Sequence, residues 1–286
     1  MRGSDKMKKL TPIIEWTSLL FCTGTVILLL LVILYDLVIK GSSSLSWEFL
    51  SSMPSDGMTR GGILPAITGT ALVTLITALF AIPFGIGCAI YLSEYASNSW
   101  LTRLIRASIR NLSGVPSIIY GLFGLALFVQ GLHMGTSLVA AGLTLGLLSL
   151  PYVVTTTEEA LRRIPASTRE AALAVGATKF ESIRDVVLPS ALPGILTGVV
   201  LTLSRAAGET APILFTGVAF YINKPSGFLN QEFMALPYHL YMLSTQHQAI
   251  EQVRPLAYGT ALVLIVVVFM LNLTAFYIRY KHQNNE

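Results

Sequence analysis

Six long apolar stretches dominate the hydrophobic pattern of this chain. They cover residues 16–39, 66–91, 115–132, 138–155, 191–218 and 256–278. A helix needs roughly 20 apolar residues to cross the ~30 Å hydrocarbon core of a bilayer. The pattern therefore predicts an all-α integral membrane protein with six transmembrane helices.

These stretches divide the chain into segments. An N-terminal segment, residues 1–15, precedes the first span at 16–39, and a loop at 40–65 leads to the second span. The other five spans form one core at 66–278, which contains a long loop at 158–190 and is followed by a tail at 279–286.

The distribution of basic residues predicts the orientation of the spans. If both termini are cytoplasmic, fourteen Lys and Arg residues fall on the cytoplasmic side and four on the outer side. Positive charge concentrates in cytoplasmic loops, so we expect both termini in the cytoplasm and 40–65 as an outer loop. The one remaining basic residue of the 19, Arg205, lies inside a predicted span.

Composition narrows the class of protein. Charged residues make up 12% of the chain, about half of the ~25% that is usual in a soluble domain. Cys22 and Cys88 lie in apolar stretches and indicate neither a disulfide nor a metal site. The sequence has no nucleotide-binding or hydrolytic motif. We therefore expect no catalytic residue, metal or cofactor on this chain, and no nucleic-acid partner.

An amphipathic segment precedes the third span. Residues 97–110 place Leu101 and Leu104 on one helical face and Arg103, Arg106 and Arg110 on the other. This pattern predicts a helix that lies in the cytoplasmic headgroup region.

The loop at 158–190 is longer than a simple connection requires. Ser167 and Glu170 have the spacing of a capping box, and so do Thr178 and Glu181. Between them, Gly176 can adopt the left-handed conformation that ends a helix. The pattern predicts two short helices, joined by a glycine bend, that form a protrusion for another protein to approach.

Seven positions of this loop match a known motif: Glu170, Ala171, Ala172, Gly176, Val186, Leu188 and Pro189. They resemble the EAA motif of ABC-importer permeases, Glu-Ala-Ala-x3-Gly-x9-Ile-x-Leu-Pro, with Val186 at the Ile position. The resemblance implies a type I importer permease over 66–278, with 16–39 as an accessory first helix. In that family the loop docks on the ATPase subunit, so these seven residues are the expected coupling contacts. Glu170 has two possible roles, as a cap of its own helix or as a partner for an arginine of the ATPase, and its spacing favours the cap.

Two charges interrupt the fifth predicted span. Arg205 lies near its middle, and Glu209 follows four residues later, on the same helical face about 6 Å away. A charge at this depth costs about 2.5–3.5 kcal/mol and usually marks a pathway. Because a guanidinium is a forked donor for an oxyanion, we predict a substrate path that contains Arg205, Glu209, Ser204 and Thr210. The alternative is a structural ion pair that fixes helix packing or holds a gate.

Prolines and glycines predict the local shape of the spans. Pro83, Pro151 and Pro212 each remove a backbone hydrogen bond and are expected to kink a helix. Gly142 and Gly146, about one turn apart, predict close packing of two helices.

Three separate segments resemble the phosphate permeases PstA and PstC. They are Ser-Arg-Ala-Ala-Gly-Glu-Thr-Ala-Pro at 204–212, Gly-Gly-Ile-Leu-Pro-Ala-Ile at 61–67 and Ser-Gly-Val-Pro-Ser-Ile-Ile-Tyr-Gly at 113–121. The residues after Glu209 are more similar to PstA. The resemblance implies a phosphate importer of the bacterial inner membrane. Its other parts would be a PstC-like second permease, a PstB-like ATPase dimer that binds ATP and Mg²⁺, and a PstS-like external phosphate-binding protein.

Two alternatives to phosphate import stay open. In the first, the chain is a permease of the same kind whose substrate is another oxyanion, such as sulfate or molybdate. In the second, the chain is a stand-alone anion channel. The structured loop at 158–190 argues against the channel, which has no need of a docking protrusion.

Overall fold

The computed structural model describes residues 2–222 and 229–283. Within this part of the chain, five helical segments are long and apolar enough to cross a bilayer. They correspond to all or part of α1 (Arg2–Ser42), α3 (Leu64–Ile90), α6 (Leu138–Arg162), α9 (Leu188–Ala207) and α12 (Ile250–Gln283). The predicted all-α membrane fold is confirmed.

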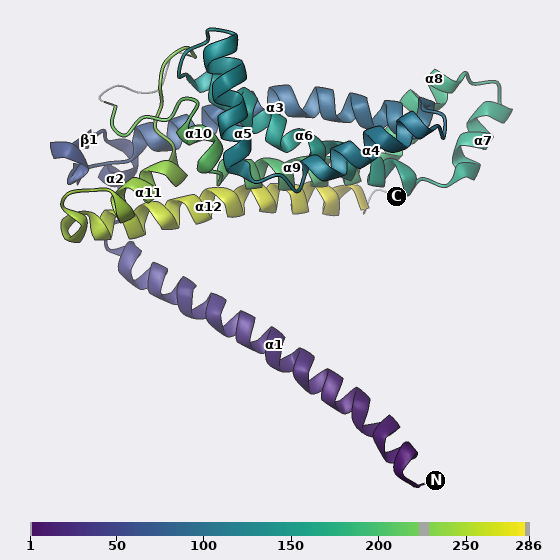
Figure 1. Cartoon of the computed structure of the whole chain (residues 1–286), viewed down its shortest axis with the longest axis horizontal. Coiled ribbons are helices and arrows are strands. Elements are labelled where there is room, and N and C mark those ends of the chain that lie inside the picture. The colour runs from purple at the N-terminus through teal and green to yellow at the C-terminus, as the bar shows by residue number, and fades with distance from the viewer. Residues whose placement is uncertain (1, 223–228, 284–286) are drawn as a thin grey trace.

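The centre of the bundle consists of α3, α6, α9 and α12, which run along the long axis of the molecule (Figure 1). Glycines let α3 and α6 approach closely, because a Cβ added at Gly142 would lie 2.5 Å from the side chain of Ile76. The hydroxyl of Thr77 donates a hydrogen bond to the Gly142 carbonyl at 3.2 Å. A Cβ at Gly146 would lie 2.6 Å from the ring of Phe80. The close packing predicted at both glycines is confirmed.

The third predicted span is shorter than its hydropathy suggests. α5 (Ser117–Gly124) continues as the π-helix η3 (Leu125–Gly131), and together they fall short of the ~20 residues that a span needs. They reach the length of a span only with α4 (Trp100–Leu112), which meets them at an angle of 102°. Among the described residues, there is a sixth apolar segment of sufficient length only if this bent pair is counted as one span.

Two of the predicted kinks fall inside helices that do not break. α3 continues across Pro83 and α6 continues across Pro151. A bend at these two prolines stays a prediction. At Pro212 the chain has already left the long helix, as described below.

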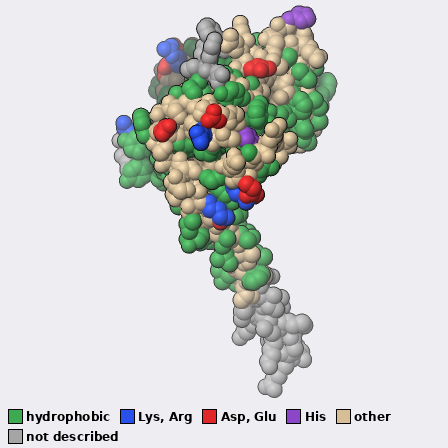
Figure 2. Space-filling model, turned by 90° about the vertical axis from the view of Figure 1, so that its left-hand side faces the viewer, with side chains coloured by type: hydrophobic (Ala, Val, Ile, Leu, Met, Phe, Trp, Pro, Cys, Tyr) green, Lys and Arg blue, Asp and Glu red, His purple; other side chains and the backbone are tan. Residues whose placement is uncertain are grey.

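The two ends of the bundle carry different elements (Figure 1). One end holds α2 (Trp47–Ser51), β1 (Pro54–Ser55), η1 (Asp56–Met58), β2 (Arg60–Gly61) and α11 (Leu236–Thr245). The other end holds α7 (Ala166–Ala174), α8 (Lys179–Glu181) and the C-terminal end of α12. Figure 2 views the first of these ends, where acidic and basic side chains are scattered among hydrophobic ones.

The first helix stands apart from the bundle (Figure 1). The apolar part of α1, Trp16–Ser42, has none of its most hydrophobic window buried. Its C-terminal end is tied to α12 just beyond the helix, where the hydroxyl of Ser44 donates to the carbonyl of Pro255 at 2.9 Å. α1 thus presents its apolar surface to the surroundings rather than to the core of its own chain.

Candidate substrate site and coupling segment

The fifth predicted span is a helix that ends early. Helical turns run without a break from Lys179 through η4 (Ser182–Val187) to the end of α9 at Ala207. The short helix α10 (Ala211–Leu214) follows, with Pro212 in its first turn. Pro212 has no N–H to give to the Gly208 carbonyl, so a continuous helix would lack a hydrogen bond at this point, and α9 has already ended at Ala207. The prediction of one helix over 191–218 was therefore wrong in its second half.

The break places Arg205 in the last turn of a helix and still at mid-depth. Its guanidinium carbon lies 4.4 Å from the centre of the Tyr152 ring. Tyr152 is two residues past the midpoint of α6, Leu138–Arg162, which is one of the membrane-crossing helices. A positive charge also suits the negative end of the helix dipole at this terminus. Helices that are interrupted at mid-depth are a recurring feature of substrate sites in transporters.

Arg205 and Glu209 form the predicted pair, but they bind each other weakly. Nε of Arg205 lies 3.4 Å from Oε1 of Glu209, the long end of the hydrogen-bond range. The arginine side chain is 52% exposed, while that of Glu209 is 16% exposed. A guanidinium has five N–H donors, and Nε–H is the one that has a partner among the described residues. The remaining donors of Arg205 are free to bind an anion.

Tyr152 is a member of this site that the sequence analysis missed. Its ring lies against the Arg205 guanidinium, and its hydroxyl donates to the Ser113 carbonyl at 2.9 Å. It therefore connects the end of α9 to the loop between α4 and α5. A tyrosine in the middle of an apolar span, directly after Pro151, was the available signal, since a buried hydroxyl needs a partner.

The structure does not bring the other predicted path residues to the guanidinium. Ser204 is buried, and its hydroxyl donates to the Val200 carbonyl at 2.8 Å. Thr210 is half-buried at the start of α10, where its carbonyl accepts from the Leu214 amide at 3.2 Å. The exposed part of the site consists of Arg205 above the Tyr152 ring, with Glu209 beside it.

The loop at 158–190 contains one of the two predicted short helices, α7. α7 ends in a Schellman arrangement, in which Ala177 N–H bonds to the Ala172 carbonyl and Gly176 N–H to the Leu173 carbonyl. Gly176 has a φ of 92°, as predicted for a left-handed turn. The second predicted helix, however, is the beginning of the long helix that runs to Ala207.

One of the two predicted capping boxes is present. Thr178 accepts from the Glu181 amide, and the Glu181 carboxylate accepts from the Thr178 amide at 2.7 Å. Ser167, in contrast, lies inside α7, which begins one residue earlier after Pro165 and has no side-chain cap. Glu170 consequently does not cap this helix. It is exposed and has no partner among the described side chains.

The EAA positions divide between a buried and an exposed face. Ala172 is buried, and Val186 and Leu188 are half-buried. The other four motif residues, Glu170, Ala171, Gly176 and Pro189, are exposed. Large apolar side chains are exposed around them: Leu173 at 49%, Phe180 at 61% and Val175 at 86%. An exposed apolar patch on a protrusion is typical of a protein-binding surface.

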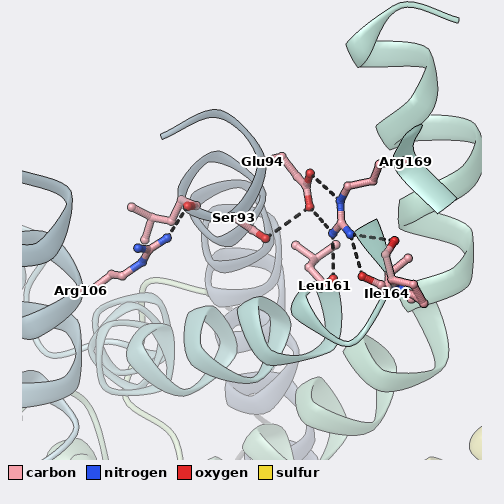
Figure 3. Close-up of polar contacts among 8 residues, drawn as sticks. Ser93, Glu94, Arg106, Leu161, Ile164 and Arg169 are labelled. Atoms are coloured by element: carbon pink, nitrogen blue, oxygen red, sulfur yellow. Dashed lines mark hydrogen bonds and ion pairs between the residues drawn. The ribbon is translucent and has the colours of Figure 1, made fainter. Parts of the chain in front are cut away.

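A network of charged groups lies between this loop and the bundle (Figure 3). Arg169 of α7 binds Glu94, which lies in the π-helix η2 (Tyr91–Tyr95) at the end of α3. Arg106 of α4 donates to the Leu92 carbonyl at 2.6 Å, and its Nε is 2.8 Å from Glu158. Arg106, which the amphipathic pattern of 97–110 places on the polar face of its helix, has a side chain that is only 21% exposed.

A helical membrane bundle with a charged break at mid-depth is typical of transport proteins. Residues 81–282 match the family described as "Binding-protein-dependent transport system inner membrane component". The chain belongs to this family, and it is a multi-pass ABC transporter permease with the type I importer fold.

Relatives in several bacteria are similar over most of the chain. One is the "Probable ABC transporter permease protein YqgI" of Bacillus subtilis, 33% identical over 267 residues, which are 89% of this chain and 90% of that protein. Another is the "Phosphate transport system permease protein PstA 1" of Mycobacterium tuberculosis, 37% identical over 221 residues, with 77% and 71% covered. The PstA protein of Yersinia pestis is 35% identical over 246 residues, with 85% and 81% covered.

Solved structures share the fold at low sequence identity. A permease for the polysaccharide alginate superposes with a TM-score of 0.64 at 15% identity, over 96% of this chain and 99% of that chain. The inward-facing methionine transporter MetNI superposes with a TM-score of 0.62 at 20% identity, over 77% of this chain and 94% of that chain. At these identities the likeness concerns the fold alone.

Proposed function

We propose that this chain is the permease subunit of an ATP-driven phosphate importer and that phosphate passes Arg205 on its way across the membrane. The observation that carries the proposal is a guanidinium at mid-depth whose donors are largely free. Phosphate is bound well by the planar fork of an arginine. The similarity to PstA proteins supports phosphate as the anion.

Glu209 would tune the site. A carboxylate 3.4 Å from Nε holds the guanidinium in place and competes with the anion for it. A bound anion is therefore released more readily than from an isolated arginine. Transport requires this balance, since a site that binds too tightly does not release its substrate.

Energy would reach the site from the coupling segment. The exposed EAA residues and the apolar side chains of Leu173, Val175 and Phe180 would dock on an ATPase subunit. From Lys179 to Ala207 the chain is one helical segment of 29 residues, about 43 Å long at ~1.5 Å per residue. A shift of the protrusion would thus be carried to the turn that holds Arg205.

The assembly would consist of this chain, a PstC-like second permease, a PstB-like ATPase dimer with ATP and Mg²⁺, and a PstS-like binding protein. We place it in the bacterial inner membrane, with both termini in the cytoplasm. The arrangement in Figure 1 supports this orientation, because the far ends of α1 and α12 point toward the end that carries α7 and α8. The end with α2 and β1 would then face the binding protein.

The test is uptake of labelled phosphate by vesicles that contain the assembled complex. Arg205→Gln should abolish uptake while the complex still copurifies with its ATPase. Arg254→Gln is the matched control, because Arg254 is equally exposed at 54% and pairs with Glu251 three residues away. We expect unlabelled phosphate, and neither sulfate nor molybdate, to compete. Normal uptake in Arg205→Gln, or competition by sulfate alone, would refute the proposal.

A further inference from the structure

Arg169 makes more hydrogen bonds than any other arginine whose side chain the structure describes. Its Nε and Nη2 hold the two Glu94 oxygens at 3.1 and 2.8 Å. Nη2 also donates to the Leu161 carbonyl at 2.9 Å, and Nη1 donates to the Ile164 and Pro165 carbonyls at 2.7 and 3.4 Å. These contacts use all five N–H donors of the guanidinium.

The contacts join three elements. Arg169 belongs to α7, Leu161 to the last turn of α6 just before it, and Glu94, 75 residues away, to η2, the π-helix that follows α3. The Leu161 and Pro165 carbonyls already accept from the Ile164 and Thr168 amides at 3.2 Å, so Arg169 adds a charged second donor to them. Figure 3 shows the guanidinium between the carboxylate and these carbonyls.

The pair is also shielded from water. Glu94 is 7% exposed and Arg169 is 25% exposed. A bidentate pair of this kind has a fixed geometry, and removing one partner leaves a charge without compensation in a partly buried place. The contact between Arg169 and Glu94, called the joint below, is therefore costly to break.

A second arginine contacts the same region with fewer hydrogen bonds. Arg106 donates to the Leu92 carbonyl, two residues before Glu94, and its Nε lies against Glu158 of α6. α4 is thereby tied to the ends of α3 and α6 to which Arg169 binds. α4 leads directly to the loop at Ser113, on which the hydroxyl of Tyr152 rests.

We propose that Arg169 is a positioning residue that keeps α7 in one rigid body with the cytoplasmic ends of α3 and α6 throughout transport. Movement of the ATPase then reaches α3 and α6 directly through Arg169–Glu94, in addition to its route along α9. This inference rests on the proposed role of the chain as an ATP-driven permease. It does not depend on the identity of the anion.

The first test compares transport with ATP use. Glu94→Gln keeps the shape of the side chain and removes the charge, and Arg169→Gln removes the fork. Each should lower the amount of phosphate imported per ATP hydrolysed by about tenfold, which corresponds to a coupling energy of about 1.4 kcal/mol. ATP hydrolysis itself should persist. Arg162→Gln is the control, because Arg162 pairs with Glu158 nearby and is 57% exposed. An unchanged ratio in both Glu94→Gln and Arg169→Gln would overturn the inference.

The second test replaces the ion pair by a covalent link. In a background with Cys22 and Cys88 changed to serine, the double variant Glu94→Cys, Arg169→Cys should be uncoupled. A short thiol-to-thiol cross-linker between the two cysteines should restore import per ATP. If the two elements separate during the cycle, the cross-linked protein stays inactive, and the rigid-body proposal is refuted. If the wild-type complex imports another anion instead of phosphate, both tests are run with that anion. A failure of the phosphate proposal is then seen in the wild-type complex, whereas a failure of the rigid-body proposal is seen only in the variants.

Discussion

Arg169 and Arg205 have the same side chain and opposite surroundings. Arg169 uses all five donors on Glu94 and three carbonyls, and its carboxylate partner is 75 residues away in the sequence. Arg205 uses one donor, on a carboxylate four residues away, and is about twice as exposed, at 52% against 25%. All donors of Arg169 are bonded within the chain, whereas Arg205 has donors that can bind a ligand.

This difference in bonded donors distinguishes two roles of an arginine: holding elements together, as in the joint, and binding an anion, as proposed for Arg205. An arginine with a full set of partners would lose bonds by binding an anion, so it transmits position. An arginine with free donors beside an aromatic ring gains bonds when an anion arrives. The count of engaged donors, rather than the presence of a nearby carboxylate, thus distinguishes the two roles in this protein.

Removing the two carboxylates should give the largest contrast. Glu94→Ala leaves Arg169 unpaired and should destabilise the protein by about 3 kcal/mol, the lower end for breaking a buried pair, since Arg169 is partly exposed. Glu209→Ala should change stability by less than about 1 kcal/mol, because its partner is exposed to solvent. Apparent melting temperatures of the purified variants in detergent measure both effects. Equal shifts in the two variants would remove the distinction between joint and site.

The sequence alone could predict one of these arginines and not the other. Arg205 stands out because it is a charge in an apolar span, and Glu209 follows at helical spacing. The pair of Glu94 and Arg169 is brought together only by the fold, and no local pattern connects residues so far apart. Arg169 could be recognised as part of a motif segment, but its partner could not.

The same limit explains which parts of the fold were predicted. The spans of α3, α6 and α12 follow from the length of their apolar stretches, which burial in a membrane dictates. Hydropathy runs unchanged through Gly208 and Pro212 and so predicted one span to residue 218. Pro212 indicated a kink there, but not that the helix ends already at Ala207. The spacing of Ser167 and Glu170 fits a capping box, but the N-cap of α7 is Pro165, two residues before Ser167. Hydropathy and spacing constrain the surroundings of a helix more than its ends.

Tyr152 provides a smaller test on the side of the site. Tyr152→Leu removes the ring beneath the Arg205 guanidinium, and a cation–π contact at an exposed site is worth about 0.5–1 kcal/mol. The KM for phosphate uptake should therefore rise about two- to fivefold. Tyr152→Phe keeps the ring and loses only the bond to the Ser113 carbonyl, so it should leave KM close to the wild-type value. If Tyr152→Phe were as impaired as Tyr152→Leu, the hydroxyl and not the ring would position the arginine.

The smallest expected effect concerns the protrusion formed by residues 158–190. Two of its residues have the same capping-box spacing in the sequence and differ in the structure. Thr178 caps the start of the helix that leads to Arg205, and Thr178→Ala should cost about 1 kcal/mol of local stability. Ser167 makes no cap, so Ser167→Ala should cost less than about 0.5 kcal/mol. Hydrogen exchange of the amides at 178–182 measures the difference, with faster exchange in Thr178→Ala alone. Because a frayed protrusion would pass less of the ATPase movement to α9, Thr178→Ala should also lower import per ATP slightly. Equal exchange in the two variants would mean that the rigidity of the protrusion comes from Gly176 and the Schellman turn instead.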